Sequence, residues 1–259
     1  MGPIDRAYRH PVLYDLEYQD LAADIQHYKA IARRRGGPIL ELGVGNGRIA
    51  LPLARSGIQV HGVDLSADML RSLRAKLERE PIHVQKMVHS EQGDFRHLHG
   101  PQRYRTVFLP FNAIHHCTHH QDLLDLLASV DRVLLPEGQF YLDCYLPDPI
   151  LHGRDPDETY GHTTFTHPTL GVPIESWEQS WYDPIAQVHH VVYTYVVGKE
   201  PPTTVKLDLR VFHYQEMLAL LDWGGFRIRS EAGSFRGDPV TAGSTKWVLQ
   251  LERKPETPR

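Results

Sequence analysis

Cysteines, long apolar runs and an excess of basic residues are all scarce in this sequence. Its 259 residues contain two cysteines, Cys117 and Cys144, which are too few for a disulfide framework, so a reducing cytoplasm is the expected compartment. No apolar run approaches the roughly 20 residues that span a membrane, and the first residues lack the pattern of a signal peptide. The net charge of −4 and the pI near 6.5 exclude the basic surface typical of nucleic-acid binding. We therefore expect a soluble protein without membrane or nucleic-acid partners.

Residues 38–70 are the most informative stretch that is present. Residues 39–42 form a short apolar run, which predicts a strand buried on both faces of a parallel sheet. Gly43, Gly45 and Gly47 follow at alternate positions, where they allow a tight turn and the close approach of a ligand to a helix N-terminus. After that helix and a second strand comes Asp64, at the point where such sheets place a carboxylate to accept hydrogen bonds from ribose hydroxyls. This order predicts one nucleotide-binding half of a doubly wound sheet.

The glycine spacing narrows the choice of nucleotide. Nicotinamide enzymes use G-x-G-x-x-G, whereas these three glycines alternate and follow Glu41, which suits a cationic cofactor better than a diphosphate. At this point the chain resembles the class I S-adenosylmethionine-dependent methyltransferases, whose first motif, E/D-x-G-x-G-x-G, it matches position by position. The resemblance implies S-adenosylmethionine as cofactor and S-adenosylhomocysteine as product.

Later motifs extend the resemblance as far as residue 145. Asp64 with Leu65 resembles the ribose-binding motif, and Asp94 with Phe95 resembles the pair that contacts adenine. Residues 109–116 look like the fourth-strand motif. Residues 135–140 look like the turn that leads into the fifth strand, although Glu137 replaces a usual glycine. The resemblance implies these cofactor-binding residues: Tyr14, Glu41, Gly43, Gly45, Gly47, Asp64, Leu65, Met69, Asp94, Phe95, Pro110 and Asn112.

The alternation of strands and helices predicts a single α/β domain with a doubly wound, Rossmann-like sheet in the order 3-2-1-4-5-7-6. Ser66 is placed to cap a helix over residues 67–78, while residues 82–91 fit either helix or strand. The expected parts are an N-terminal cap and helix (1–37), a cofactor-binding core (38–146), a small antiparallel β insertion (147–211) and a return to the core sheet (212–259). Within the insertion we expect a polar loop over 147–168 and strands over 174–182, 188–197 and 204–211.

The insertion is expected to cover the acceptor pocket, as in related methyltransferases that act on small molecules. Arg210 is of interest because a guanidinium can hold an acidic group through two hydrogen bonds. Near the N-terminus, Tyr8, Tyr14 and Tyr18 either close the cofactor pocket or anchor the terminus to the domain surface. The candidates for lining the acceptor pocket, each of which can also be read as a packing residue, are Tyr145, Tyr160, Trp177, Trp181 and Arg210.

The expected chemistry follows from the cofactor. A sulfonium methyl group is already activated, so the protein mainly aligns the acceptor and excludes water. A hydroxyl or ammonium acceptor must also lose a proton, and His116, with His115 second, follows the fourth strand where a base would stand. His116 and His120, four residues apart, can also be read as metal ligands, but no third ligand is evident and we expect no metal.

Within the family, the chain most resembles sugar and natural-product N- or O-methyltransferases. We expect a small-molecule acceptor and a monomer or homodimer. Three alternatives remain open: a nicotinamide oxidoreductase, an enzyme that uses S-adenosylmethionine without methylating, such as a cyclase, and a non-catalytic cofactor-binding subunit.

Overall fold

The computed structural model describes residues 8–255, so the first seven residues of the expected N-terminal cap and the last four of the expected return to the core sheet lie outside the described residues. Its largest element is a seven-stranded sheet in the order β10-β11-β5-β4-β1-β2-β3, in which β11 alone runs antiparallel to the other six strands. Since β10 and β11 are the sixth and seventh strands of this sheet along the chain, the predicted order 3-2-1-4-5-7-6 is confirmed. The strands are β1 (Ile39–Leu42), β2 (Val60–Asp64), β3 (Val88–Gln92), β4 (Tyr104–Leu109), β5 (Leu134–Tyr145), β10 (Phe226–Ala232) and β11 (Lys246–Arg253).

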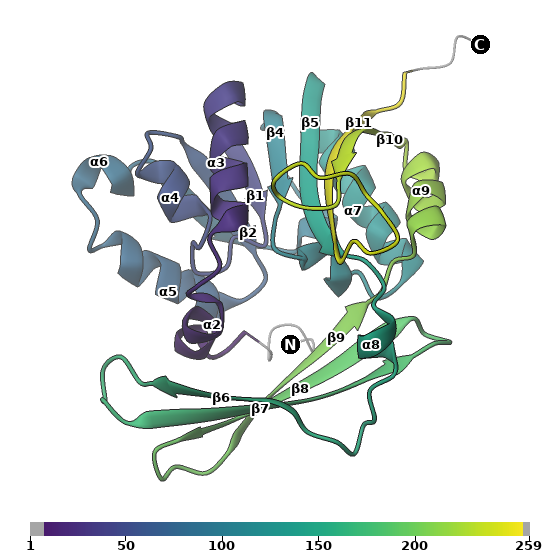
Figure 1. The fold of residues 1–259 in the computed structure, drawn as a ribbon. Coiled ribbons are helices and arrows are strands. Elements are labelled where there is room, and N and C mark those ends of the chain that lie inside the picture. Colours follow the sequence, from purple (N-terminus) through teal and green to yellow (C-terminus); the bar gives the residue numbers. More distant parts are fainter. Residues whose placement is uncertain (1–7, 256–259) are drawn as a thin grey trace.

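Helices cover both faces of this sheet, because neighbouring side chains of each central strand point to opposite faces. Ile39 and Phe108 pack with α3 (Ala23–Arg35), α4 (Ala50–Ala54) and α5 (Ala67–Leu77). Leu40 and Val107 pack with α7 (His120–Val133) and α9 (Tyr214–Trp223) on the other face. Figure 1 shows the two helical layers on either side of the strands. The sheet is thus buried on both faces, as its apolar strands predict.

Helix α5 shows how local sequence fixes the element that follows the second strand. Ser66 adopts an extended backbone conformation and its Oγ accepts a hydrogen bond from the backbone N–H of Met69, which confirms the predicted cap. Asp68 in the first turn and Lys76 in the last turn complement the helix dipole. The helix therefore begins immediately beyond Asp64 and holds the end of β2 in place.

The insertion forms a separate antiparallel sheet in the order β6-β7-β8-β9. Its strands are β6 (Tyr160–Thr166), β7 (Pro173–Asp183), β8 (Val188–Val197) and β9 (Thr203–Arg210), preceded by α8 (Pro149–His152). Ile174, Tyr195 and Val205 on its inner face pack against Leu13 of α2 (Pro11–Tyr18). Figure 1 shows α2 lying between this sheet and the core. The sheet and α2 together face the carboxyl ends of the core strands.

Three local expectations need correction. β6 occupies part of the stretch 147–168 that was expected to be a polar loop; it is an edge strand exposed along most of its length, so it lacks an apolar alternation. The turn expected at residues 135–140 lies inside β5 as an irregularity, where the partners shift from Tyr104 with Leu134 to Thr106 with Gln139. Residues 82–91 are neither one helix nor one strand but α6 (Ile82–Gln85) followed by β3.

Between β3 and β4 the chain forms only the short 3₁₀ helix η1 (Phe95–His97) and a loop. Across residues 8–255, no helix is both long enough and apolar enough to cross a bilayer.

Candidate active site

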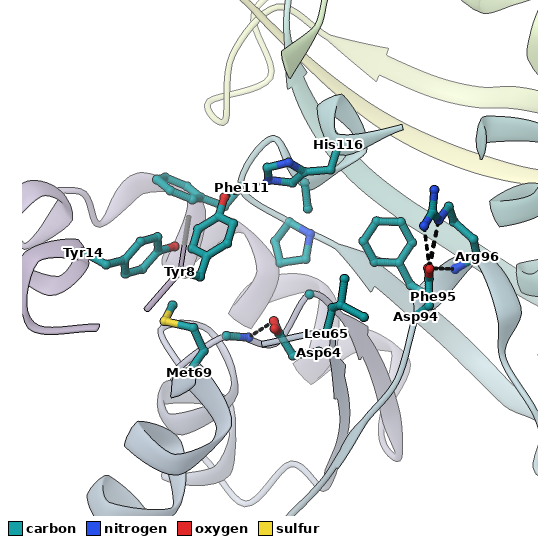
Figure 2. Close-up of a pocket in the computed structure, with 14 residues that line it drawn as sticks. Tyr8, Tyr14, Asp64, Leu65, Met69, Asp94, Phe95, Arg96, Phe111 and His116 are labelled. Carbon is teal, nitrogen blue, oxygen red and sulfur yellow. Dashed lines mark hydrogen bonds and ion pairs between the residues drawn. The ribbon is translucent and has the colours of Figure 1, made fainter. Parts of the chain in front are cut away.

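Two adjoining cavities lie where the core strands end and the N-terminal segment crosses over them. The first, the cofactor cavity, contains about 730 Å³ of space, part of which is open to solvent. Figure 2 shows Tyr8 and Tyr14 on one side of it and Phe95 with Asp94 on the other. Its lining residues are Tyr8, Tyr14, Gly43, Gly45, Asp64, Leu65, Met69, Asp94, Phe95, Arg96, Pro110, Phe111, Ala113 and His116.

The glycine turn and Asp64 form the floor of the cofactor cavity. Gly43 and Gly45 have φ angles of 68° and 53°, in the left-handed region that glycine adopts without strain. The N–H of Gly45 donates to Asp64 Oδ2 at 2.7 Å and the N–H of Ser66 donates to Oδ1 at 2.8 Å. Each carboxylate oxygen therefore keeps one lone pair for a ligand. Burial raises the pKa of Asp64, and the two backbone hydrogen bonds partly oppose that shift.

Gly47 belongs to the same motif but does not line the cavity. Its φ is 88°, and a Cβ at this position would lie 2.5 Å from Leu73 Cδ1 and 3.1 Å from Leu51 Cγ. Its place in the motif is therefore explained by close packing of the turn against α4 and α5.

Asp94 and Phe95 lie opposite the tyrosines. Burial raises the pKa of Asp94, but hydrogen bonds from Arg96 outweigh this effect, so its pKa is lowered overall. Arg96 Nη2 donates to Asp94 Oδ2 at 2.6 Å, and its Nη1 donates to Asp122 Oδ1 at 2.5 Å. Arg96 itself lines the cavity. It was not among the residues predicted to bind the cofactor, although it directly follows the Asp94–Phe95 pair.

Two further residues predicted to bind the cofactor lie elsewhere. Glu41 is buried, does not line the cavity, and its Oε2 has no hydrogen-bond partner. Burial raises the pKa of Glu41 well above its usual range. Asn112 lines the second cavity instead. The open lone pairs of Asp64 fit a ligand that brings hydrogen-bond donors, whereas Glu41 lies behind the lining of the cavity.

The second cavity, the acceptor cavity, encloses about 790 Å³ including its mouth and has an aromatic wall. Tyr8, Tyr14, Phe111 and His116 line both cavities, so the two meet at these four side chains. Of the two roles left open for the N-terminal tyrosines, the structure therefore supports lining of the pockets. The remaining lining residues are His10, Leu13, Glu17, Tyr18, Asn112, Tyr145, Tyr193, Tyr195, Val205, Leu207 and Leu209.

His116 stands at the junction of the cavities. Its Nε2 shares a hydrogen bond of 2.7 Å with the Tyr8 hydroxyl, and burial lowers its pKa to about 4. The imidazole is therefore neutral at pH 7 and can accept a hydrogen bond. His120, the possible second metal ligand, is exposed at the start of α7, and residues 8–255 hold no group of three or more His, Cys, Asp or Glu side chains arranged for a metal.

His115 lies away from both cavities, contrary to its predicted place at the mouth. It is fully buried, its Nδ1 bonds the carbonyl of Arg210 at 2.5 Å, and its Nε2 accepts the N–H of Tyr145 at 3.1 Å. Burial lowers its pKa to about 3. With both ring nitrogens engaged, His115 joins η2 (Ala113–His116) to β5 and β9 and has no free position for an acceptor.

Of the five residues expected in the acceptor pocket, only Tyr145 lines it. Trp177 pairs across strands with Thr194 and stacks on His162 at a centroid distance of 5.3 Å. Trp181 stacks on His190 at 5.0 Å. Both tryptophans share the outer face of the insertion sheet, since residues an even number apart point the same way.

Tyr160 and Arg210 are also occupied outside the acceptor cavity. The Tyr160 ring lies under the guanidinium of Arg154 at 4.5 Å. Arg210 donates to Glu216 Oε1 at 2.5 Å, to Gln187 Oε1 at 3.0 Å and to the carbonyl of Thr118 at 3.1 Å. It therefore joins β9 to α9 and does not hold an acidic acceptor group. The inner-face residues that do line the cavity, and that were missed, are Tyr193, Tyr195, Val205, Leu207 and Leu209.

An alternating glycine turn, a carboxylate at the end of β2 and this sheet order define a class of enzyme. The chain is an S-adenosylmethionine-dependent methyltransferase, and its sheet order and site are those of the class I enzymes. Residues 39–138 match the family described as "Methyltransferase domain".

Relatives and solved structures agree with this assignment. The chain is 28% identical over 227 residues to the cypemycin N-terminal methyltransferase of Streptomyces sp, covering 85% of this chain and 84% of that protein. It is 29% identical over 231 residues to the putative methyltransferase YqeM of Bacillus subtilis, covering 84% of each. The structure of the CcbJ methyltransferase from Streptomyces caelestis superposes with a TM-score of 0.75 at 26% identity, covering 91% and 98% of the two chains. The glycopeptide N-methyltransferase MtfA complexed with S-adenosylmethionine shares the fold, with a TM-score of 0.61 at 20% identity over 92% and 90%.

Proposed function

We propose that the enzyme transfers a methyl group from S-adenosylmethionine to a nitrogen of a small, largely apolar amine that binds in the acceptor cavity. The observation that carries the proposal is the junction of the two cavities at Tyr8, Tyr14, Phe111 and His116. A donor in one cavity and an acceptor in the other would meet there. Holding two reactants in line is the main requirement for transfer of an activated methyl group.

The acceptor cavity favours an uncharged or cationic group. Its walls are mostly tyrosines and aliphatic side chains, Glu17 is its acidic residue, and within residues 8–255 no lysine or arginine lines it. Among the described residues a carboxylate or phosphate would meet no lysine or arginine in this cavity, and Arg210 is engaged with Glu216. An amine is also consistent with the cypemycin N-terminal methyltransferase among the relatives.

Each residue of the site would have its own role in the transfer of the methyl group. When bound, the cofactor supplies an electrophilic methyl group whose bond to sulfur breaks as the bond to the acceptor nitrogen forms. Asp64 would accept hydrogen bonds from the ribose hydroxyls. With Nε2–H donating to the Tyr8 hydroxyl, neutral His116 would accept a hydrogen bond from the acceptor N–H on Nδ1 and so orient the lone pair of the acceptor, while Tyr8 and Phe111 would exclude water.

Incubation of the enzyme with deuteromethyl-labelled S-adenosylmethionine and a metabolite extract tests this proposal. Mass spectrometry should show a product heavier by one labelled methyl, with fragments that locate it on nitrogen, together with S-adenosylhomocysteine. His116→Ala should slow the transfer by about 10²-fold, whereas His120→Ala, a change at an exposed histidine, should leave it unaltered. A labelled oxygen would refute the amine acceptor, and methylthioadenosine as the nucleoside product would refute methyl transfer.

A further inference from the structure

The turn that follows β4 has an unusual backbone. Phe111 and Asn112 are consecutive non-glycine residues with φ angles of 58° and 60°. This left-handed region is costly for side chains with a Cβ, so such residues persist only where their surroundings hold them. Phe111 lines both cavities, so any contact that stabilises this turn also fixes the position of the wall that the two cavities share.

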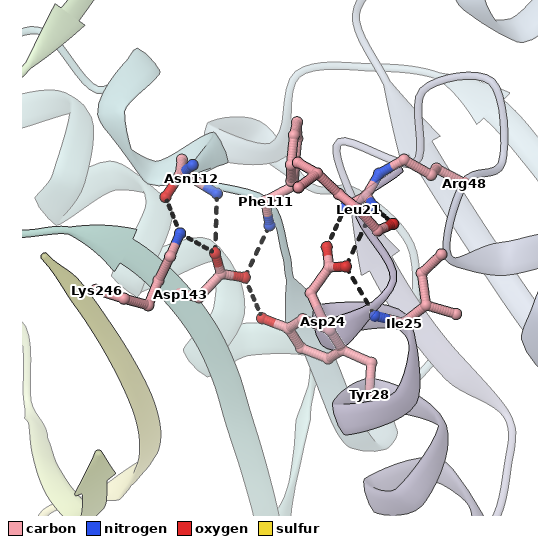
Figure 3. Close-up of polar contacts among 9 residues, drawn as sticks. All are labelled: Leu21, Asp24, Ile25, Tyr28, Arg48, Phe111, Asn112, Asp143 and Lys246. Carbon is pink, nitrogen blue, oxygen red and sulfur yellow. Dashed lines mark hydrogen bonds and ion pairs between the residues drawn. The ribbon is translucent and has the colours of Figure 1, made fainter. Parts of the chain in front are cut away.

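A buried carboxylate from the neighbouring strand holds the turn. Asp143 of β5 is fully buried and accepts the N–H of Phe111 on Oδ1 at 2.8 Å and the N–H of Asn112 on Oδ2 at 3.3 Å. Figure 3 shows the carboxylate in the centre of these donors. Two successive backbone N–H groups aimed at one carboxylate form a concave site for a negative charge, which the left-handed turn creates.

Two side chains complete the arrangement. The Tyr28 hydroxyl of α3 donates to Asp143 Oδ1 at 2.8 Å, and Lys246 Nζ of β11 lies 3.3 Å from Oδ2. Lys246 also donates to Asn112 Oδ1 at 2.8 Å, so it bridges the carboxylate and the turn. Neither Asp143 nor Lys246 is among the lining residues of either cavity. Their effect on a ligand is therefore exerted through the turn.

The Phe111 ring transmits this placement to the N-terminal segment. Its centroid lies 4.8 Å from that of Tyr18 and 6.1 Å from that of Tyr14, and the Arg48 guanidinium lies over the ring at 4.0 Å. We propose that Asp143 is a positioning residue, which fixes Phe111 and Asn112 in the left-handed turn and so prepares the shared wall of the two cavities before ligands bind. Without it, ligand binding would have to order the turn, and affinity would fall.

Fluorine NMR and calorimetry on the full chain test this inference without the acceptor. Protein labelled with 4-fluorophenylalanine should give one sharp Phe111 resonance, assigned by comparison with Phe111→Leu. Asp143→Asn places an amide NH₂ among N–H donors, so the resonance should shift or split, and the dissociation constant for S-adenosylhomocysteine should rise roughly five- to tenfold. Lys246→Met removes the bridge between Asp143 and Asn112 at a partly exposed position. It should also shift or split the Phe111 resonance, and the dissociation constant for S-adenosylhomocysteine should rise roughly two- to threefold.

Tyr28→Phe is the matched control, because it removes a donor to the same carboxylate and leaves both turn N–H groups bonded. It should lower the melting temperature without changing the Phe111 resonance or the affinity. The inference is overturned if Asp143→Asn lowers only the melting temperature, or if affinity falls while the Phe111 resonance stays unchanged. If Asp143→Asn does not fold, Lys246→Met replaces it in the test. A loss of affinity together with a changed Phe111 resonance then supports the inference, and a lower melting temperature alone, or a loss of affinity with an unchanged resonance, overturns it.

Discussion

Asp64→Asn is the sharpest test of how the chain holds its cofactor. In the structure each carboxylate oxygen accepts one backbone N–H, from Gly45 or Ser66, and retains one lone pair toward the cavity. An asparagine keeps the shape but supplies only one oxygen, and its NH₂ must face one of the two N–H groups. The variant therefore loses one bond to the ribose and weakens the other.

The size of this loss follows from the charge of the acceptor. A hydrogen bond to a charged group contributes about 1.5–3 kcal/mol, and each 1.4 kcal/mol changes a dissociation constant about tenfold. We therefore expect the dissociation constant for S-adenosylhomocysteine to rise roughly 10- to 150-fold. The glycine turn should also become less stable, since one backbone N–H loses its partner.

Titration calorimetry with S-adenosylhomocysteine measures the effect directly. Ser66→Ala is the control, because Ser66 caps α5 beside Asp64 and does not line the cavity; its Oγ also donates to the carbonyl of Tyr8 at 3.3 Å, and the Tyr8 ring keeps its own bond to His116. It should lower the free energy of unfolding by about 0.5–2 kcal/mol and leave the affinity within about twofold of the wild type. If Asp64→Asn binds S-adenosylhomocysteine as tightly as Ser66→Ala does, the carboxylate does not hold the ribose.

Two further predictions concern stability. Gly47→Ala places a Cβ 2.5 Å from Leu73 Cδ1 at a φ of 88°. The free energy of unfolding, measured by denaturant titration, should therefore fall by about 1–3 kcal/mol. An unchanged denaturation midpoint would contradict the packing role of Gly47. Because the pKa of His116 is about 4 in the fold and about 6.5 when unfolded, the unfolded chain takes up the proton first as the pH falls between these values. The free energy of unfolding should therefore decrease on acidification, by at most about 1.4 kcal/mol per pH unit for this group. In His116→Gln the decrease should be less steep. Equal slopes of the free energy of unfolding against pH in the wild type and the variant would contradict the prediction.

The core of the site could be predicted because its signals are local. Alternating glycines, a strand-end carboxylate and the Ser66 cap each act within a few residues, and the structure places Gly43, Gly45 and Asp64 in one cavity. The role of Asp143 could not be predicted from local sequence. Its hydrogen-bond donors come from α3, from the turn that follows β4, and from β11, and these segments are far apart in the sequence.

The acceptor side could not be predicted in the same way. Trp177 and Tyr193 are both aromatic residues on neighbouring strands of the insertion, yet only Tyr193 lines the cavity. Which face points inward depends on how the sheet packs against α2, and a strand's own alternation is the same for either face. Likewise, nothing in the sequence shows that Arg210 is engaged by Glu216, or that adjacent residues His115 and His116 point in different directions.

The insertion sheet contributes five residues to the acceptor cavity, all from β8 and β9, and none to the cofactor cavity. In the proposed function these five residues therefore contact only the acceptor, whereas Tyr8, Tyr14, Phe111 and His116 line both cavities. Substitutions at these five positions should therefore change which compounds are methylated and leave the affinity for S-adenosylmethionine unaltered.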